Sequence, residues 1–454
     1  MLVQHEALDV QAEVVRPAAK VRRRQPQRPR GVIFRPLLFS LVPTSEVSNR
    51  ILLFTGKGGT GKTTCAAATG LKAARRGQKT LVLSSDPAHS LSDAFDAELG
   101  PEPQTVAPNL DAQEVDLYYS MQKYWGNMRE LMLAVFRWQG VEQVAAEELA
   151  ALPGMNEGSV MLWLEKFWAE GDYDLIVLDS APTGETLTLL TLPQATQWWL
   201  TKAFPFQKTA FKTLGFGVRQ ATGLPLDKAY DDLDYLFGKL EQIQEVLADP
   251  EQTSVRLVMN PEKMVIQEAR RAYTYLQLYG YGVDAALVNR VWPEEGVGPA
   301  MQKYVEAQQG YLDEIEGSFA PLPILRAPHL GEEVFGLERL EKVGNALYGA
   351  AAEGDADTTE GVRAPAARLH QSQTYRVAEM EQGDGYRVEL HLPFLKEEDV
   401  DVRQFGDQLV VQVENQRRHY VLPNFLGYYT LQGDHLREDG WLEVRFARGA
   451  KRRA

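Results

Sequence analysis

The sequence predicts an α/β protein with a doubly wound, mostly parallel sheet, a helical subdomain and a C-terminal all-β sandwich domain. Three observations support this prediction. Short apolar runs alternate with long helical stretches between residues 50 and 350. A glycine-rich loop joins the first apolar run to a helical stretch. Beyond residue 372 the apolar residues recur with a period of two, which is typical of antiparallel strands.

Length and composition exclude several classes of protein. A chain of 454 residues is long enough for two or three domains with buried cores. No apolar run approaches the roughly 18 residues that a membrane-spanning helix needs. The net charge of −14 argues against general nucleic-acid binding, because neutralising phosphates requires a basic face. We therefore expect a globular protein of the cytoplasm.

The first 49 residues are rich in proline and basic residues, and we expect them to form a disordered tail. A signal peptide is disfavoured because Arg35 and Pro36 interrupt the apolar run at 31–39 and no small-residue cleavage site follows. A transit peptide or an overlong choice of start codon stays open as an alternative for this segment.

A phosphate-binding loop (P-loop) of the nucleoside-triphosphatase type is predicted between a buried strand at 51–55 and a helix at 65–76. The motif G-x-x-x-x-G-K-[ST] is met by Gly56, Gly61, Lys62 and Thr63. Backbone N–H groups of such a loop converge on phosphates, and glycines permit a close approach of the main chain. The expected nucleotide contacts in this loop are Gly56, Lys57, Gly58, Gly59, Thr60, Gly61, Lys62, Thr63 and Thr64.

Two side chains of the loop have predicted chemical roles. Lys62 is expected to supply positive charge to the β- and γ-phosphates, and the Thr63 hydroxyl is placed to bind Mg²⁺. The sequence therefore predicts binding of ATP together with Mg²⁺.

The loop also carries a second lysine, Lys57, directly after its first glycine. In this form, K-G-G-x-G-K-T-T, it resembles the deviant P-loop of a class of dimeric ATPases. That class includes the arsenite-transporter ATPase (ArsA), the targeting ATPase for tail-anchored membrane proteins, the ParA/MinD partition proteins and the nitrogenase iron protein. The resemblance implies a homodimer in which Lys57 reaches the nucleotide of the other subunit and acts like an arginine finger.

The second predicted strand, at 79–85, ends in Asp86. A strand that runs into Asp-Pro places a carboxylate at the carboxyl edge of the sheet, where doubly wound sheets bind ligands. The string D-P-A-H-S-L-S-D-A-F over 86–95 resembles switch I of the ArsA and tail-anchor ATPases. This resemblance implies that Asp86 positions and polarises the attacking water. The structural alternative is that Asp86 only caps the following helix.

The third predicted strand, at 173–179, ends in Asp179 and fits a Walker B motif, whose carboxylate engages Mg²⁺ directly or through water. The string D-S-A-P-T-G-x-T that begins at Asp179 resembles switch II of the same family. Members often carry His at the x position, where this chain has Glu185, so the role of Glu185 stays open. The predicted catalytic residues are Asp86, Lys57, Lys62 and Asp179.

Two further strands are predicted at 255–259 and 283–289. The second leads into Asn289 and Arg290, where related ATPases have an Asn that hydrogen-bonds the adenine. Residues 327–336 resemble the adenine-side loop, which adds Pro328 to the expected nucleotide contacts. A plain turn at a strand end is the alternative for both segments.

Helical periodicity extends over about 115–170 and 194–250, and both stretches are rich in methionine or aromatic residues. In the tail-anchor ATPases this region is a helical subdomain whose apolar groove, completed by dimer closure, holds a client's transmembrane helix. Methionine and aromatic side chains suit such a groove, although a packed helical core is their commoner fate. The groove candidates are Met121, Met128, Met132, Trp198, Trp199, Phe204 and Phe211.

The C-terminal part is predicted to be a separate domain. Small polar residues at 351–372 predict a linker between an ATPase domain at 50–350 and a β domain at 373–454. Alternating apolar runs predict strands at 386–392, 408–413, 417–422 and 441–446.

The pattern of the β domain resembles the α-crystallin domain of small heat-shock proteins. The resemblance lies in residues 392–402, 406–410 and 439–444. We expect His391 and His419 at surface positions of these strands, because their spacing does not suit a metal site.

The chain contains one cysteine, Cys65. A single cysteine excludes an intrachain disulfide and the CxxC zinc clasp of eukaryotic tail-anchor ATPases. It also counts against an iron–sulfur cluster and against capture of arsenite by several thiolates. We therefore expect neither a zinc site nor an iron–sulfur cluster.

Together, these patterns predict an Mg²⁺-dependent ATPase whose nucleotide-gated homodimer binds and delivers hydrophobic client segments. A membrane receptor is a further candidate partner. Three alternatives stay open: an ATP-switched holdase chaperone without membrane targeting, a ParA/MinD-like positioning ATPase, and an anion pump ATPase of the arsenite type.

Overall fold

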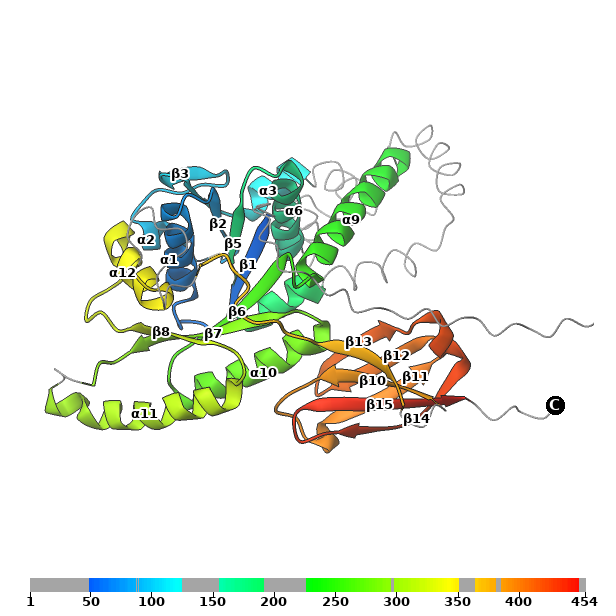
Figure 1. The fold of residues 1–454 in the computed structure, drawn as a ribbon. Coiled ribbons are helices and arrows are strands. Elements are labelled where there is room, and N and C mark those ends of the chain that lie inside the picture. The colour runs from blue at the N-terminus through cyan, green and yellow to red at the C-terminus, as the bar shows by residue number, and fades with distance from the viewer. Residues whose placement is uncertain are drawn as a thin grey trace, which may run out of the picture. The chain divides into compact units, whose positions relative to one another are not determined.

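The computed structural model describes residues 49–86, 88, 90–124, 155–191, 226–294, 298–350, 364–380 and 385–448. The predicted disordered tail, except for residue 49, lies outside these ranges. An eight-stranded sheet has the strand order β3-β4-β2-β5-β1-β6-β7-β8 (Figure 1). All neighbouring strands in it run parallel except β3 and β4. The predicted doubly wound, mostly parallel sheet is therefore confirmed.

Five of these strands match the predicted ones. The strands of the sheet are β1 Arg50–Thr55, β2 Thr80–Ser84, β3 Gln104–Ala107, β4 Leu110–Glu114, β5 Leu175–Asp179, β6 Thr253–Met259, β7 Val283–Val291 and β8 Ile324–Pro328. The sequence did not predict β3, β4 or β8. Strand β3 is short and largely exposed, and β8 carries alternate exposed residues, so neither shows the continuous apolar run of a central parallel strand.

Helices cover both faces of the sheet, and this explains why the central strands are apolar throughout. Leu52 and Phe54 of β1 pack in a core with α1 Lys62–Arg75, α2 Ser90–Phe95 and α12 Gly336–Tyr348. Ile51 and Leu53 point to the opposite face. There the core includes α3 Leu117–Tyr124, α6 Met155–Glu170, α9 Leu226–Ala248, α10 Lys263–Tyr279 and α11 Pro299–Phe319.

Helices α3 and α6 lie in the first predicted helical stretch, and α9 lies in the second. Trp163 of α6 is fully buried, and its ring lies against Tyr124 and Phe167, so part of this aromatic content forms core. The groove candidates from Met128 to Phe211 lie outside the described residues, and nothing is described of the Met121 side chain. The client groove stays a prediction. Among the helices that the structure describes, none combines the length and hydropathy of a bilayer span.

Residues 375–380 and 385–448 form an antiparallel β sandwich, drawn in orange and red in Figure 1. One sheet has the order β14-β15-β10-β9 and the other β11-β12-β13. The strands are β9 Tyr375–Glu379, β10 Gly385–His391, β11 Val400–Phe405, β12 Gln408–Val413, β13 Gln416–Val421, β14 Tyr429–Leu436 and β15 Trp441–Arg448, with short 3₁₀ turns at Glu397–Asp399 and Asn424–Tyr428. The predicted all-β architecture is confirmed.

The apolar side chains of alternate strand positions form the sandwich core, as their period of two predicted. Glu389 of β10 is the exception, because its carboxylate is fully buried. Three guanidinium groups surround this carboxylate and compensate its charge, those of Arg376, Arg387 and Arg437.

The sandwich packs on α10. Leu278 of this helix belongs to the sandwich core. The Tyr275 hydroxyl donates to the Glu414 carboxylate over 2.6 Å, and the Tyr279 hydroxyl donates to Gln416 Oε1 over 2.7 Å. The expectation that His391 is a surface residue is wrong, because its ring is half-buried beside α10 and within hydrogen-bonding distance of Gln277.

The second part of the predicted linker also packs on the sheet. Arg256 of β6 forms a buried ion pair with Asp284 of β7, at 3.1 Å. Arg256 also donates to the carbonyl of Ala367 over 3.0 Å, and the Leu369 N–H donates to Asp284 over 3.1 Å. Residues 364–372 are therefore a packed segment and not a free linker, whereas 351–363 lie outside the described residues. The domain boundaries themselves stay predictions.

Candidate nucleotide-binding site

The P-loop connects β1 to α1, and its glycines are required by close contacts. A Cβ on Gly56 would lie 2.1 Å from the carbonyl oxygen of Val258 on β6. A Cβ on Gly61 would lie 2.1 Å from the side-chain nitrogen of Asn289, and the φ angle of 87° at Gly61 is one that side chains disfavour. The motif glycines therefore allow the loop to lie against two neighbouring strands.

Asn289 at the end of β7 supports the loop. Its side-chain amide is buried and donates a hydrogen bond to the carbonyl of Thr60 over 3.0 Å. The Thr60 hydroxyl in turn donates to the carbonyl of Lys57 over 2.9 Å. The sequence predicted an adenine contact for Asn289 but not this bond to the loop. The adenine contact stays a prediction.

A cavity of about 700 Å³ lies beside the loop, a volume in the range of ligand sites. Residues predicted from four separate sequence segments line it: Gly59, Gly61, Lys62, Thr63, Thr64, Asp86, Asn289, Arg290 and Pro328. The sheet brings them together because the carboxyl ends of its parallel strands meet at one edge. Gly56, Lys57, Gly58 and Thr60 complete the same loop.

Lys62 begins α1, and no acidic residue occupies the first turn of this helix, so its positive end is available for an anion. The Lys62 side chain is buried, and its ammonium donates to the carbonyl of Lys57 over 3.4 Å. Burial lowers the pKa of Lys62, while the nearby Asp179 and Asp86 carboxylates raise it. These surroundings favour a bound phosphate as an additional partner for the ammonium.

Asp179 ends β5 between β1 and β2, and its side chain is fully buried. Burial raises the pKa of Asp179 to about 7, against the opposing effects of the Thr63 hydroxyl and Lys62. The Ser84 hydroxyl donates to Oδ2 over 3.3 Å, whereas Oδ1 accepts no hydrogen bond from the residues that the structure describes.

A buried carboxylate oxygen without a donor, next to the Thr63 hydroxyl, fits a site for Mg²⁺, which prefers oxygen ligands. Thr63 and Asp179 would hold this ion, directly or through water. When bound there, Mg²⁺ would neutralise charge on the carboxylate and on the phosphates.

Asp86 follows β2 and forms a turn ahead of α2. Its Oδ1 accepts the Ala88 N–H over 3.0 Å. The alternative that Asp86 only caps α2 is not supported, because the Leu91 and Ser92 N–H groups donate instead to Glu114 Oε1, over 3.1 and 2.9 Å. The Asp86 side chain lines the cavity, where it could orient a water molecule.

Glu114 is a residue that supports the candidate site and that the sequence analysis missed. It is buried at the end of β4 and holds the N-terminus of α2 next to the cavity. A second contact places α2 against the P-loop helix, since the Thr63 and Ser90 hydroxyls lie 3.0 Å apart. The only sequence signal for Glu114 was an acidic residue after a short run of strand-like residues, which is too weak to identify its partner.

The signature lysine has different surroundings from Lys62. The Lys57 ammonium lies 3.8 Å from the carboxylate of Glu268 on α10, and each side chain is about a third exposed (35% and 30%). Lys57 is not among the residues that line the 700 Å³ cavity. Glu185, in the segment that resembles switch II, is exposed, and its charge opposes the lowering of the Lys62 pKa that burial causes. Its role stays open.

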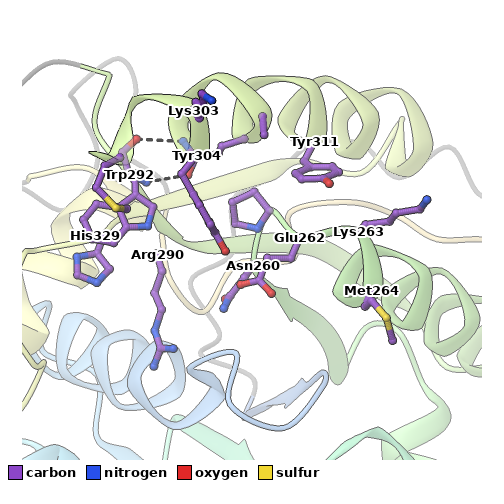
Figure 2. Close-up of a pocket in the computed structure, with 14 residues that line it drawn as sticks. Asn260, Glu262, Lys263, Met264, Arg290, Trp292, Lys303, Tyr304, Tyr311 and His329 are labelled. Carbon is purple, nitrogen blue, oxygen red and sulfur yellow. Dashed lines mark hydrogen bonds between the residues drawn. The ribbon is translucent and has the colours of Figure 1, made fainter. Parts of the chain in front are cut away.

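A second cavity of about 620 Å³ adjoins the first, and Arg290 and His329 line both (Figure 2). Trp292 stacks on His329 with ring centroids 4.0 Å apart. The Trp292 N–H donates to Gln308 Oε1 over 2.9 Å, and Gln308 Nε2 donates to the Trp292 carbonyl over 3.0 Å, so this stack is fixed to α11. Arg290 adopts a left-handed backbone conformation, with a φ angle of 57°.

Comparison with known proteins gives two family matches. A family described as anion-transporting ATPase matches residues 49–349, and an HSP20-like domain found in ArsA matches residues 383–446.

Individual relatives cover nearly the whole chain. A Chlorobaculum tepidum protein with the provisional name arsenical pump-driving ATPase is 39% identical over 402 residues, which are 87% of this chain and 96% of the relative. An Aquifex aeolicus protein with the provisional name arsenical pump-driving ATPase 1 is 37% identical over 393 residues, which are 83% and 95% of the two chains. Protein Rv2184c of Mycobacterium tuberculosis is 29% identical over 424 residues, 87% of this chain and 96% of its own.

Proposed function

The chain belongs to the anion-transporting ATPase (ArsA) family, and from this premise we propose that it is an Mg²⁺-dependent ATPase whose nucleotide-gated homodimer binds apolar client segments. The catalytic part of this proposal rests on one observation. The side chains of Lys62, Asp86 and Asp179 lie close together at the P-loop. These are the groups that phosphoryl transfer to water requires.

Each residue of this set has a separate task in hydrolysis. The loop N–H groups and the Lys62 ammonium bind the β- and γ-phosphates, where they stabilise the negative charge of the transition state. The Asp86 carboxylate orients the attacking water for attack in line with the leaving oxygen. Thr63 and Asp179 would hold Mg²⁺, which would supply positive charge at the phosphates.

Lys57 links hydrolysis to the dimer in this proposal. Its ammonium lies outside its own cavity, so a closing second subunit could receive it. A cation that reaches the γ-phosphate only on closure makes turnover depend on dimer state. ATP binding would then favour the closed dimer, and hydrolysis would favour separation.

The apolar client is supported by the C-terminal domain and by the composition of the helical stretches. The HSP20-like sandwich exposes apolar side chains at Phe405, Val421, Phe425 and Tyr428. Exposed apolar groups of this kind are a feature of protein-binding surfaces. The proposed helical contribution comes from the groove candidates Met121, Met128, Met132, Trp198, Trp199, Phe204 and Phe211.

An anion pump is the second candidate, because two close relatives carry provisional names of arsenical pump-driving ATPases. Thiolate capture of arsenite does not suit this chain. Cys65 is its one cysteine, it is fully buried in α1, and burial raises the pKa of its thiol to about 12. A pump role would need an anion site of different chemistry.

The two candidates can be separated by ATP turnover of the purified protein. We would measure phosphate release with arsenite, with an apolar helical peptide, and with a peptide of the same composition whose apolar residues are interrupted by lysines. The client proposal predicts a response to the apolar peptide alone. A response to arsenite and to neither peptide would instead support the pump.

A further inference from the structure

We propose that Glu268 is a positioning residue for hydrolysis: it holds Lys57 within its own subunit and releases it when the dimer closes. This inference rests on the proposed cross-subunit role of Lys57 and adds the group that controls it. The ion pair joins the P-loop to α10, two segments that are about 210 residues apart in sequence, with the ammonium 3.8 Å from the carboxylate.

The backbone of Lys57 is fixed, so that its side chain is the part that can move. Its carbonyl accepts hydrogen bonds from the Thr60 hydroxyl over 2.9 Å and from the Lys62 ammonium over 3.4 Å. Gly56 and Gly58 flank it, and neither can supply a side chain to hold the ammonium. The direction of the Lys57 side chain is therefore set by its partner on α10.

Glu268 is carried by a helix that is held on several sides. Val265, Ile266 and Ala269 of α10 are buried against the sheet. Arg270 forms an ion pair of 2.8 Å with Glu314 on α11. The C-terminal half of α10 packs on the sandwich, where the Thr274 hydroxyl donates to the Pro393 carbonyl over 2.6 Å. The Glu268 carboxylate is thus presented from a rigid element.

The Lys57–Glu268 ion pair is exposed enough to form and break reversibly. An ion pair whose side chains are about a third exposed changes the ratio of paired to unpaired lysine by roughly fivefold at most, and salt weakens the pair. The proposal requires that Lys57 leaves Glu268 in order to contact a phosphate in the other subunit. A symmetric dimer breaks two such pairs when it closes. Together the two pairs therefore disfavour the closed dimer by up to about 25-fold.

The first experiment tests the holding of Lys57 in the nucleotide-free protein. Glu268→Gln preserves shape and removes the charge, and the rate of Lys57 acetylation by a soluble reagent is followed by mass spectrometry. We expect the variant to label Lys57 about two- to fivefold faster, with the exposed Lys303 of α11 labelling at the wild-type rate as an internal reference. An unchanged Lys57 rate would overturn the proposal.

The second experiment tests release, through ATP-dependent dimer formation measured by sedimentation. We expect Glu268→Gln to lower the dimer dissociation constant by about 4- to 25-fold at low salt, and the difference to vanish near 1 M salt. Glu316→Gln is the matched control, since it removes one carboxylate from a surface ion pair between α11 and Arg326 of strand β8. Dimerisation that is equal or weaker in Glu268→Gln would show that Glu268 does not restrain closure.

The proposed function can fail separately from this inference. If Lys57→Ala hydrolyses ATP at the wild-type rate, the cross-subunit role of Lys57 is wrong whatever the labelling shows. If Lys57→Ala loses hydrolysis and Glu268→Gln leaves both labelling and dimerisation unchanged, only the positioning role of Glu268 is wrong.

Discussion

Two lysines of one loop differ in their surroundings, and this difference is the basis of the separate roles that we propose for them. Lys62 is buried beside the Asp179 carboxylate and lines the cavity. Lys57 is partly exposed and pairs with Glu268 outside that cavity. In the function we propose, the same ammonium group therefore serves as a fixed phosphate ligand at one position and as a movable charge at the other.

This difference predicts an asymmetry between two alanine variants. Lys62→Ala should abolish measurable ATP binding, because it removes the positive charge proposed to bind the phosphates of the nucleotide in the same subunit. Lys57→Ala should bind ATP within a few-fold of wild type but lose turnover by a factor on the order of 10³. Titration with a fluorescent ATP analogue and phosphate release measure the two properties. An equal loss of affinity in both variants would contradict the cross-subunit role.

Asp86 carries the next prediction at this scale. Asp86→Asn keeps the shape of the side chain but removes the carboxylate that we propose to orient water, so turnover should fall by roughly 10²- to 10⁴-fold. ATP should still bind, and light scattering should show a dimer that persists after ATP is added. The Asp93 side chain on α2 also lines the cavity, so Asp93→Asn serves as the matched control for removal of a carboxylate. Wild-type turnover by Asp86→Asn would remove this residue from the mechanism.

At the scale of elements, α10 connects the nucleotide site to the sandwich. Glu268 lies toward the P-loop, while Leu278 is part of the sandwich core. His391 of β10 lies at this junction, with its ring 6.2 Å from that of Tyr273. Burial lowers the pKa of His391 from its ordinary 6.5. The charge of Asp439 opposes this shift, whereas the charge of His370 adds to it.

The lowered pKa makes the junction sensitive to acid. Below the ordinary histidine pKa the unfolded chain takes up a proton before the folded chain does, so the free energy of unfolding should fall from about pH 6.5 down through the lowered pKa. His391→Gln should remove this part of the pH dependence. Urea unfolding at about pH 7.5 and about pH 5.5 measures it. The same pH dependence in His391→Gln and wild type would exclude His391 as its source.

At the scale of the whole molecule, the sandwich is a packed neighbour of the ATPase sheet and not a freely tethered unit. Residues 364–372 lie against the buried pair of Arg256 and Asp284. Leu278 is covered by the sandwich core. The predicted nucleotide-binding and catalytic residues, however, all precede residue 340. The sandwich therefore contributes to stability without adding a predicted catalytic group.

Removal of residues 373–454 should accordingly separate stability from chemistry. The truncated protein should unfold at a lower temperature, because Leu278 becomes exposed and the hydroxyls of Tyr275 and Tyr279 lose their partners. Its ATP turnover, measured below that temperature, should stay within a few-fold of wild type, while its suppression of aggregation of a model substrate should change. If turnover collapses in a truncated protein that remains folded, the sandwich takes part in the ATPase mechanism.

The local parts of the protein could be predicted from the sequence. The P-loop, Asp86 and Asp179 each follow a short apolar strand, and parallel strands necessarily bring their carboxyl ends to one edge. The period of two in the last eighty or so residues predicted the sandwich, since one face of each strand is buried. In each case the information lies within a few neighbouring residues.

Only the tertiary structure decided which distant groups meet. The bond from Asn289 to Thr60, the Glu114 carboxylate at α2 and the pair of Lys57 with Glu268 each join segments that no local pattern relates. Such contacts depend on strand order, strand register and the rotation of each helix about its axis, which the packing of the whole core sets. The sequence by itself therefore determined the chemistry of the phosphate site, and the packing of sheet, α10 and sandwich decided what supports and restrains it.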